Sequence, residues 1–254
     1  MVGITTGVSI KTDADIKKMT EGGKHLHRIK DELKKVIKVG ANAAEVEKLA
    51  LGLIEKIGGQ ASFKMVPGYY WATCINVNSG LVHGIPRKNL VFKKGDLVSV
   101  DIGLYYQGFH TDSSFSLGLG LNPEAERFLK TGEIALKKSV EAVSIGGRIY
   151  DISQAMEKAI KGSGYSPIKA LVGHGVGKEL HEEPAIPCFT DGKREDSLLI
   201  KEDMVLAIEV MYAMGKPEVA LENDEWTIVS ADGKITALFE ETVAVTKNGP
   251  IVLT

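Results

Sequence analysis

Four acidic residues lie in stretches that otherwise read as buried β-strands. Asp101, for example, stands in the middle of the apolar run Val98–Leu104. A carboxylate held in such a strand costs on the order of several kcal/mol unless a hydrogen bond or a cation compensates it. The four acids of this kind are Asp101, Asp112, Glu209 and Glu240.

One interpretation is that each acid lies on an edge strand and points into solvent. Four acids in apolar runs of one chain argue against this interpretation. The alternative is that they converge. Converging carboxylates repel one another and need protons or metal ions, and their summed charge of −4 would be neutralised by two divalent cations. A turn at Gln107-Gly108 also predicts a hairpin that brings Asp101 close to Asp112.

Histidine is the residue type that would complete such a site. His174 lies between Gly173 and Gly175, and alternating glycines argue against a helix and for a close approach of the backbone. A lone histidine is more often a packing residue, but beside a predicted metal site His174 is a candidate ligand. His25 and His27 are two residues apart on a predicted helix, so they face different ways and cannot chelate one ion together.

The same glycine-rich run does not match the phosphate-binding motifs. A P-loop needs Gly where Val172 stands and Ser or Thr where Glu179 stands, and a dinucleotide fingerprint needs Gly at Lys178. No Gly-x-Ser-x-Gly elbow indicates a serine hydrolase. Cys74 has no local feature that would activate it as a nucleophile, so packing is the favoured interpretation.

Two similar successions of helices and strands would position these residues. Apolar periodicity and caps predict helices at 13–37, 43–57, 123–143 and 151–161, and strands at 73–78, 97–105, 109–117, 204–211, 225–230 and 235–245. A shift of 106 residues aligns Gly40 with Gly146 and Gly58 with Gly164. We therefore predict one domain over residues 1–254, built from related halves at about 13–120 and 121–250 with a shared cleft between them.

Composition sets limits on the class of protein. The chain has 254 residues, 44% of them hydrophobic and 25% charged, which is ordinary for a globular protein, and its net charge is −2. That balance gives no basis for nucleic-acid or membrane-surface binding, and no apolar stretch is long enough to span a membrane. With two cysteines and no visible secretory signal, we expect a cytoplasmic protein without disulfides.

The ordered motifs resemble those of the methionine aminopeptidases. They comprise an Asp, a second Asp eleven residues on, Gly-His-Gly, His-Glu-Glu-Pro, Ile-Glu and a late Phe-Glu; the segment Val82-His83-Gly84-Ile85-Pro86 resembles the type I subgroup. The resemblance covers about residues 13–250. It implies an α+β pita-bread fold, in which two pseudo-symmetric halves form a curved antiparallel sheet with outer helices. The implied reaction is metal-dependent removal of the N-terminal methionine from nascent proteins and peptides.

The resemblance also implies a role for each matching residue. Asp101 would bind one metal ion, His174 and Glu209 the other, and Asp112 and Glu240 both. The two ions would be Mn, Fe, Co or Zn, because carboxylates and one imidazole are mostly hard ligands. Glu209 would also shuttle the proton, and His83 and His181 would hold the substrate and the developing oxyanion. The side chains that match the family's methionine pocket are Tyr69, Cys74 and Trp226.

Four positions depart from the family pattern. Glu241 stands where type I enzymes usually have His, Val210 replaces a usual Pro, Val82 a usual Cys or aromatic residue, and Val66 a common aromatic residue. Because adjacent strand residues point to opposite faces, only one of Glu240 and Glu241 can enter the site, and we expect it to be Glu240. Val66 and Val82 leave room for a wider or differently shaped pocket.

Two other functions remain open from the sequence. The first is another exopeptidase of the same fold, such as a Xaa-Pro aminopeptidase, towards which Glu241 and the segment Tyr105–Phe109 lean. The second is a non-catalytic binding protein on the same scaffold. Such proteins typically lose metal ligands, whereas all five candidate metal ligands are present here. The implied partners are peptide N-termini, with the ribosome as a candidate, and the implied state is a monomer.

Overall fold

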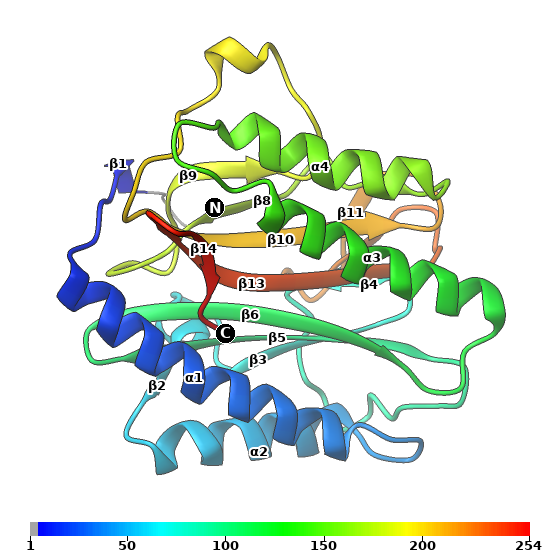
Figure 1. Ribbon diagram of the computed structural model, residues 1–254. Helices are drawn as coiled ribbons and strands as arrows, with labels where there is room; N and C mark the ends of the chain where they lie inside the picture. The colour runs from blue at the N-terminus through cyan, green and yellow to red at the C-terminus, as the bar shows by residue number, and fades with distance from the viewer. Residues whose placement is uncertain (1–4) are drawn as a thin grey trace.

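The computed structural model describes residues 5–254, and its centre is one large twisted sheet (Figure 1). Within these residues the sheet has 11 strands, and its neighbouring strands pair antiparallel except β1 with β9. In order across the sheet they are β1 (Thr5–Val8), β9 (Glu182–Pro187), β8 (Val172–Gly175), β10 (Val205–Ala213), β13 (Thr236–Thr246), β6 (Phe109–Gly118), β5 (Leu97–Tyr106) and β2 (Gln60–Ala61), with β14 (Gly249–Val252) on β13, β3 (Thr73–Val77) on β5 and β7 (Ser166–Pro167) on β10.

The described residues also form a second, smaller sheet and two short 3-10 helices. The small sheet joins segments far apart in the chain, in the order β11 (Val219–Leu221), β12 (Ile228–Ser230) and β4 (Gly80–Val82). The 3-10 helices are η1 (Ser62–Met65) and η2 (Arg194–Asp196).

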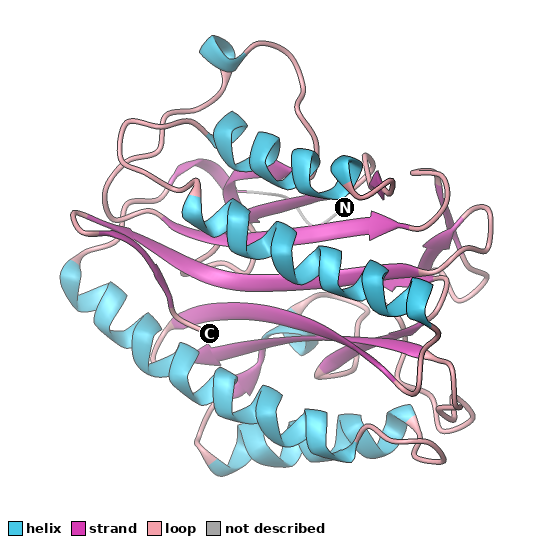
Figure 2. Ribbon diagram, turned by 45° about the vertical axis from the view of Figure 1, so that its right-hand side comes forward, coloured by secondary structure: helices cyan, strands magenta, loops and turns pink. Residues whose placement is uncertain are grey.

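Four α-helices cover one face of the large sheet (Figures 1 and 2). They are α1 (Asp13–Val36), α2 (Ala43–Lys56), α3 (Pro123–Glu141) and α4 (Ile149–Gly162). Thr12 and Asp15 form a capping box that satisfies backbone donors at the start of α1, and Pro123 occupies the first turn of α3, where its missing N–H leaves no hydrogen bond unmade. All four helices were predicted from the sequence within about two residues at each end.

Two predicted boundaries were wrong for reasons visible in side chains. We expected the last helix to begin at Asp151, but it begins at Ile149, because the Asp151 carboxylate accepts the backbone N–H of Arg148 at 2.9 Å as the third residue of a capping box. We expected a strand from residue 225, but β12 begins at Ile228, because Asp224 holds the N–H groups of Trp226 and Thr227 in a turn.

The 106-residue shift seen in the sequence relates two helices residue for residue. Adding 106 to the bounds of α2, 43 and 56, yields 149 and 162, which are the bounds of α4. The glycines that precede and follow these helices also correspond, because Gly40 and Gly146 have φ of 89° and 80°, and Gly58 and Gly164 have φ of 71° and 84°. The two halves therefore begin their inner helices with the same local chain geometry.

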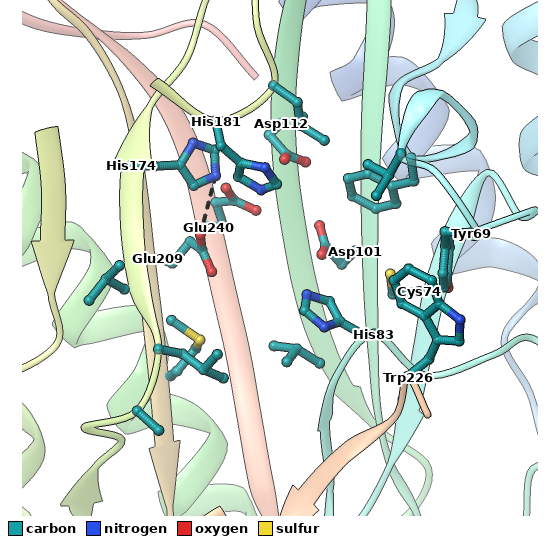
Figure 3. Close-up of a pocket in the computed structure, with 18 residues that line it drawn as sticks. Tyr69, Cys74, His83, Asp101, Asp112, His174, His181, Glu209, Trp226 and Glu240 are labelled. Atoms are coloured by element: carbon teal, nitrogen blue, oxygen red, sulfur yellow. Dashed lines mark ion pairs between the residues drawn. The ribbon is translucent and has the colours of Figure 1, made fainter. Parts of the chain in front are cut away.

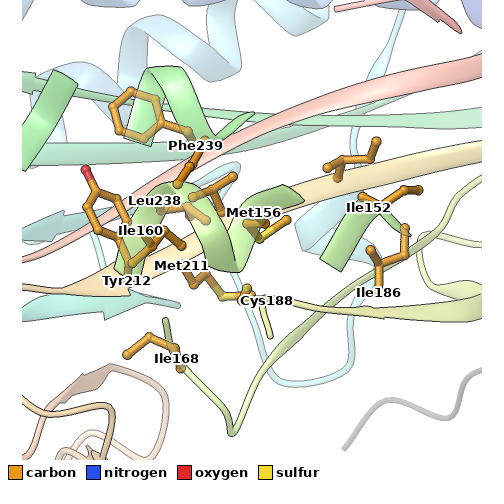
Figure 4. Close-up of a cluster of buried hydrophobic side chains, with 14 of the residues drawn as sticks. Ile152, Met156, Ile160, Ile168, Ile186, Cys188, Met211, Tyr212, Leu238 and Phe239 are labelled. Carbon is orange, nitrogen blue, oxygen red and sulfur yellow. The ribbon is translucent and has the colours of Figure 1, made fainter. Parts of the chain in front are cut away.

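Each group of helices packs on its own part of the sheet and forms its own core. One core combines α1 and α2 with β5 and β3, through side chains such as Leu33, Ile54 and Val100. The other combines α3 and α4 with β10 and β13, where Met156, Ile160 and Tyr212 meet, as Figure 4 shows. The side chains named here lie on the helical side of the sheet. Among the described residues, no helix combines the length and the apolar character needed to cross a membrane.

Candidate metal centre

The face of the sheet opposite the helices carries the acidic residues. Along β5, Val100 and Ile102 pack towards α1 and α2, so Asp101 between them must point to the other face. The same alternation places Glu209 opposite Ile208 and Val210 on β10. Strands β5, β6, β13 and β10 are consecutive in the sheet, and each contributes one of the acids Asp101, Asp112, Glu240 and Glu209. The edge-strand interpretation of these acids was therefore wrong.

These acids surround a cavity of about 310 Å³ together with the three predicted site histidines. Figure 3 shows His174, His181, Glu209 and Glu240 on one side of the cavity, and Tyr69, Cys74 and Trp226 on the other, with Asp101 and His83 between them. Glu209 is the direct cross-strand partner of Glu240. Like charges in such a pair destabilise a sheet, so this arrangement needs a compensating cation or protons.

The pKa values of these acids reflect that conflict. Burial raises the pKa of Asp112 to about 7. Burial, and then the nearby charges of Asp112 and Glu209, raise the pKa of Asp101 and of Glu240 well above the ordinary carboxyl value. For Glu209 the causes are burial and then Asp112. A group of carboxyls that resist ionisation in the protein alone is typical of a site that is neutralised by a bound cation.

His174 presents a ring nitrogen to these carboxylates. Its Nδ1 lies 2.8 Å from the carbonyl oxygen of Gly175, and its Nε2 lies 3.4 Å from Glu209 Oε1. A hydrogen bond from Nδ1–H to the carbonyl fixes the tautomer in which Nε2 keeps its lone pair. Burial also lowers the pKa of His174 to about 3, so the ring is neutral, which is the state in which imidazole binds metals.

Glycine on both sides of His174 is a packing requirement. A Cβ at Gly175 would lie 2.3 Å from the carbonyl oxygen of Glu183 on β9, and a Cβ at Gly173 would lie 2.6 Å from that of Ala207 on β10. No side chain fits at either position. The expected close approach of the backbone therefore takes place between β8 and its two neighbouring strands, and it holds His174 at the cavity.

The donor set fits a divalent cation. Ligand atoms of Asp112, His174 and Glu240 all lie within 4.8 Å of one another, and all three residues are buried. Two further carboxylate oxygens, Asp101 Oδ1 and Glu240 Oε1, are buried without any hydrogen-bond partner. Buried acceptors of this kind are costly, and a metal ion would satisfy both. Asp101 and Glu209 line the same cavity.

His181 and His83 contact the cavity from two sides. The ring of His181 packs at 4.5 Å, centroid to centroid, from the ring of His174. Burial, with His83 nearby, lowers the pKa of His181 to about 4, so this imidazole is neutral and carries one N–H donor. His83 has a left-handed backbone with φ of 57° and is exposed at the cavity.

The apolar wall of the cavity contains the predicted pocket residues. The ring of Tyr69 packs edge-to-face on Trp226 at 5.0 Å, and its hydroxyl donates to the carbonyl oxygen of Thr73 at 2.9 Å. Val66 and Val82 also line this wall, whereas Val210 lies in the core on the helical side. The cysteine interpretation agrees with the structure, because Cys74 is buried and burial raises the pKa of its thiol.

Five lining residues were not singled out from the sequence, namely Phe63, Ala170, Leu171, Leu180 and Met211. Met211 could have been found, because it follows Glu209 by two positions on one strand and so shares its face. Leu180 directly precedes His181, but Phe63 lies in the short helix η1, whose position relative to the sheet no local pattern indicates.

Glu241, the unexpected acid next to Glu240, lies on the helical face. Its carboxylate pairs with Lys30 of α1 at 3.0 Å, so the expectation that only one of the two acids enters the cavity is met by Glu240. His110, two residues before Asp112, is absent from the cavity lining, and its Nδ1 lies 2.8 Å from Ser62 Oγ.

Comparison with known proteins identifies the class to which this site belongs. The family model for metallopeptidase family M24 matches residues 17–247. The chain therefore belongs to metallopeptidase family M24. It is 38% identical over 245 residues to methionine aminopeptidase 1 of Bacillus subtilis, covering 96% of this chain and 98% of that protein. Within the family, the chain belongs to the methionine aminopeptidases.

Solved structures agree with this assignment. The crystal structure of methionine aminopeptidase from Thermotoga maritima superposes with a TM-score of 0.95 at 37% identity, covering 98% of this chain and 99% of that chain. The prolidase of Pyrococcus horikoshii superposes with a TM-score of 0.76 at 23% identity, over 96% of this chain and 63% of that chain, which shows a common fold. The predicted α+β pita-bread fold is confirmed.

Proposed function

We propose that this protein hydrolyses the first peptide bond of nascent proteins and peptides and releases their N-terminal methionine, with two divalent metal ions held by the acids of the cavity. The observation that carries the proposal is the convergence of four carboxylates and one neutral imidazole from five strands on one cavity. The ions would be Mn, Fe, Co or Zn.

Five side chains would hold the ions. Asp101, Asp112, Glu209 and Glu240 would hold them through carboxylate oxygens, and His174 through its ring nitrogen. The close group of Asp112, His174 and Glu240 supports their place in this set. Metal ions bound there supply Lewis-acid polarisation of the scissile carbonyl and lower the pKa of water.

The remaining polar side chains handle protons and hydrogen bonds. Glu209 accepts a proton from the attacking water and passes it to the departing amine, since its carboxylate lies in the cavity beside His174. His181 and His83 hold the substrate, and the neutral ring of His181 donates its N–H to the oxygen on which charge develops. These roles require hydrogen-bond donors at fixed positions. The packing of the His181 ring on His174 supports such a fixed position for His181.

The apolar wall would receive the methionine side chain. Tyr69, Cys74 and Trp226 line it together with Phe63 and Leu180. Thioether sulfur makes favourable contacts at the edges of aromatic rings, and two aromatic side chains of this wall pack against each other there. With Val66 and Val82 in place of larger residues, the pocket takes methionine without a tight limit on side-chain shape.

The protein would act as a cytoplasmic monomer on chain N-termini as they leave the ribosome. Two buried free cysteines support a reducing compartment. The net charge of −2 gives no reason to expect nucleic-acid binding.

The test is peptide cleavage by metal-stripped protein after addition of Mn(II), with Met-Ala-Ser and Ala-Pro-Ala as substrates. Release of free methionine from the first peptide alone is the expected result. Release of alanine from the second would assign a Xaa-Pro aminopeptidase activity instead. No cleavage of either peptide, with metal bound, would indicate a binding protein.

A further inference from the structure

The two strands at the centre of the large sheet, β6 and β13, are joined partly by side-chain hydrogen bonds. In the part of the chain that the structure describes, their register consists of Ser114 opposite Glu240, whereas β6 pairs with β5 over its whole length. Thr242 Oγ1 donates to the carbonyl oxygen of Asp112 at 2.7 Å and accepts its N–H at 2.9 Å. We refer to this β6–β13 boundary as the seam.

The seam runs between two candidate metal ligands. Asp112 lies on β6 and Glu240 on β13, so the separation of these strands sets the separation of the two carboxylates. Their ligand atoms fall within the 4.8 Å group described above. Any group that bridges the seam next to these residues can therefore affect metal binding.

A buried lysine bridges the seam from the helical side. Lys30 of α1 has a side chain that is 3% exposed, and its Nζ lies 2.5 Å from Ser113 Oγ on β6 and 3.0 Å from both carboxylate oxygens of Glu241 on β13. Ser113 directly follows Asp112, and Glu241 directly follows Glu240. Ser113 Oγ is also 2.8 Å from the carbonyl oxygen of Glu240, to which it can donate while it accepts from Lys30.

The contacts on Glu241 leave it little freedom. Its Oε2 accepts from Lys30 and from Thr254 Oγ1 at 2.5 Å, and Ser113 Oγ lies 3.1 Å away. Neighbouring residues of a strand point to opposite faces, so a backbone held through Glu241 also holds the direction of Glu240. A buried ion pair is weak evidence for stability, since apolar replacements are often as stable, but it can specify one geometry.

We propose that the Lys30–Glu241 pair is a positioning device, which fixes the seam so that Asp112 and Glu240 are correctly spaced for a divalent metal ion. The inference rests on the proposed function of the cavity as a metal site. Residues that orient metal ligands typically change metal affinity by about 10-fold to 100-fold when they are removed. Because Lys30 acts through the residues next to the ligands, we expect the lower end of this range, about tenfold.

The experiment measures Mn(II) binding to the metal-stripped protein by titration calorimetry, and the visible absorption spectrum of the Co(II) form. The main variant is Lys30→Met with Glu241→Gln, because removing both charges leaves neither one buried alone. We expect about tenfold weaker Mn(II) binding and an altered Co(II) spectrum, which reports ligand geometry. The single variant Lys30→Arg keeps a cation that can donate to the Glu241 carboxylate, so its Mn(II) affinity should stay close to that of the parent.

The matched control is Thr236→Val, on the same strand as Glu240. Thr236 is buried, and its hydroxyl donates to the carbonyl oxygen of Gly80 at 2.8 Å, away from the seam contacts of Lys30. This variant should lower the melting temperature and leave Mn(II) affinity and the Co(II) spectrum unchanged. If the double variant is too unstable to purify, Glu241→Asp takes its place, since it keeps both charges but shortens the bridge, and weaker Mn(II) binding is again expected.

Two results would overturn the inference. Parent-like affinity and spectrum in the folded double variant would reduce the pair to a structural role, as would an equal loss of affinity in Thr236→Val. A failure of the proposed function looks different, because then the parent protein itself would bind no Mn(II), and Glu240→Gln would behave like the parent.

Discussion

Glu240 and Glu241 are neighbours in the chain but lie on opposite faces of β13. Glu240 Oε1 is buried in the cavity without a hydrogen-bond partner, whereas Glu241 is paired with Lys30. Glu240→Gln should therefore abolish tight Mn(II) binding, because an amide replaces a charged ligand. Glu241→Gln should retain binding, with no more than the modest loss expected from the seam. Calorimetry on both metal-stripped variants compares them, and equal affinities would contradict the assignment of Glu240.

A second prediction at the residue scale concerns the histidines outside the ligand set. His181→Ala and His83→Ala should each lower kcat/KM by about 10²-fold to 10³-fold, the usual effect of removing an oxyanion donor. Mn(II) affinity should stay at the parent value, since neither residue is a candidate ligand. Steady-state kinetics with Met-Ala-Ser, run at saturating metal, measures the loss. Unchanged turnover in either variant would remove that residue from the mechanism.

The acids and His174 could be predicted from the sequence because their signal is local. A charge inside an apolar strand and a histidine between glycines both violate the usual pattern, and strand alternation then chooses between Glu240 and Glu241. Phe63 and Lys30 could not be predicted. Both lie in helices with ordinary patterns, and their importance comes from contacts with strands far along the chain.

At the scale of elements, β8 depends on glycines that allow close strand packing. In Gly175→Ala the new methyl group would meet the Glu183 carbonyl oxygen at 2.3 Å, so β8 and β9 must separate. We expect a loss of about 1–3 kcal/mol in the free energy of unfolding, as for other overpacked sites. Since His174 precedes Gly175, Mn(II) affinity should fall as well. Urea unfolding and calorimetry test the two effects.

Gly52→Ala is the matched control for this substitution. Gly52 lies inside α2, is exposed, and has no atom within 4 Å of the position of an added Cβ. Alanine there should raise the free energy of unfolding by about 0.5–1 kcal/mol through helix propensity, without an effect on the metal site. A gain of stability in both variants would show that the approach of β8 to β9 tolerates a side chain.

The helices were easier to predict than the strand boundaries. Apolar periodicity and caps extend over whole helices, so small errors remain only at their ends. Strands β8 and β9 were missed because the segment Val172–Pro187 contains four charged residues and three glycines, and only pairing with β10 and β1 makes it a sheet. Side chains that bind the backbone, such as Asp224, also decide where a strand begins, and the apolar pattern does not mark that residue.

At the scale of the whole molecule, the cavity brings together acids from both halves of the chain. Metal ions should therefore stabilise the folded protein, because only the folded state brings these acids together. At a free Mn(II) concentration of 100 times Kd, the expected gain is about 2.7 kcal/mol for one site. Thermal unfolding with increasing Mn(II) measures it. A melting temperature that does not respond to Mn(II), or responds equally in Glu240→Gln, would contradict the proposed site.

The division of the chain into halves is visible in the repeated helices and the two cores. The prediction of one domain over residues 1–254 stays a prediction. The seam between the halves could not be predicted. Its hydrogen bonds join residues far apart in the chain, such as Thr242 and Asp112, and no local sequence pattern indicates that these residues are partners.

The distribution of the candidate ligands along the chain has a consequence for synthesis. Asp101 and Asp112 are translated first, and His174, Glu209 and Glu240 follow from the second half, with Glu240 emerging last. A partly made chain that ends before His174 holds only two of the five candidate ligands. The proposed metal centre would therefore be complete only after residues from both halves of the chain have been synthesised.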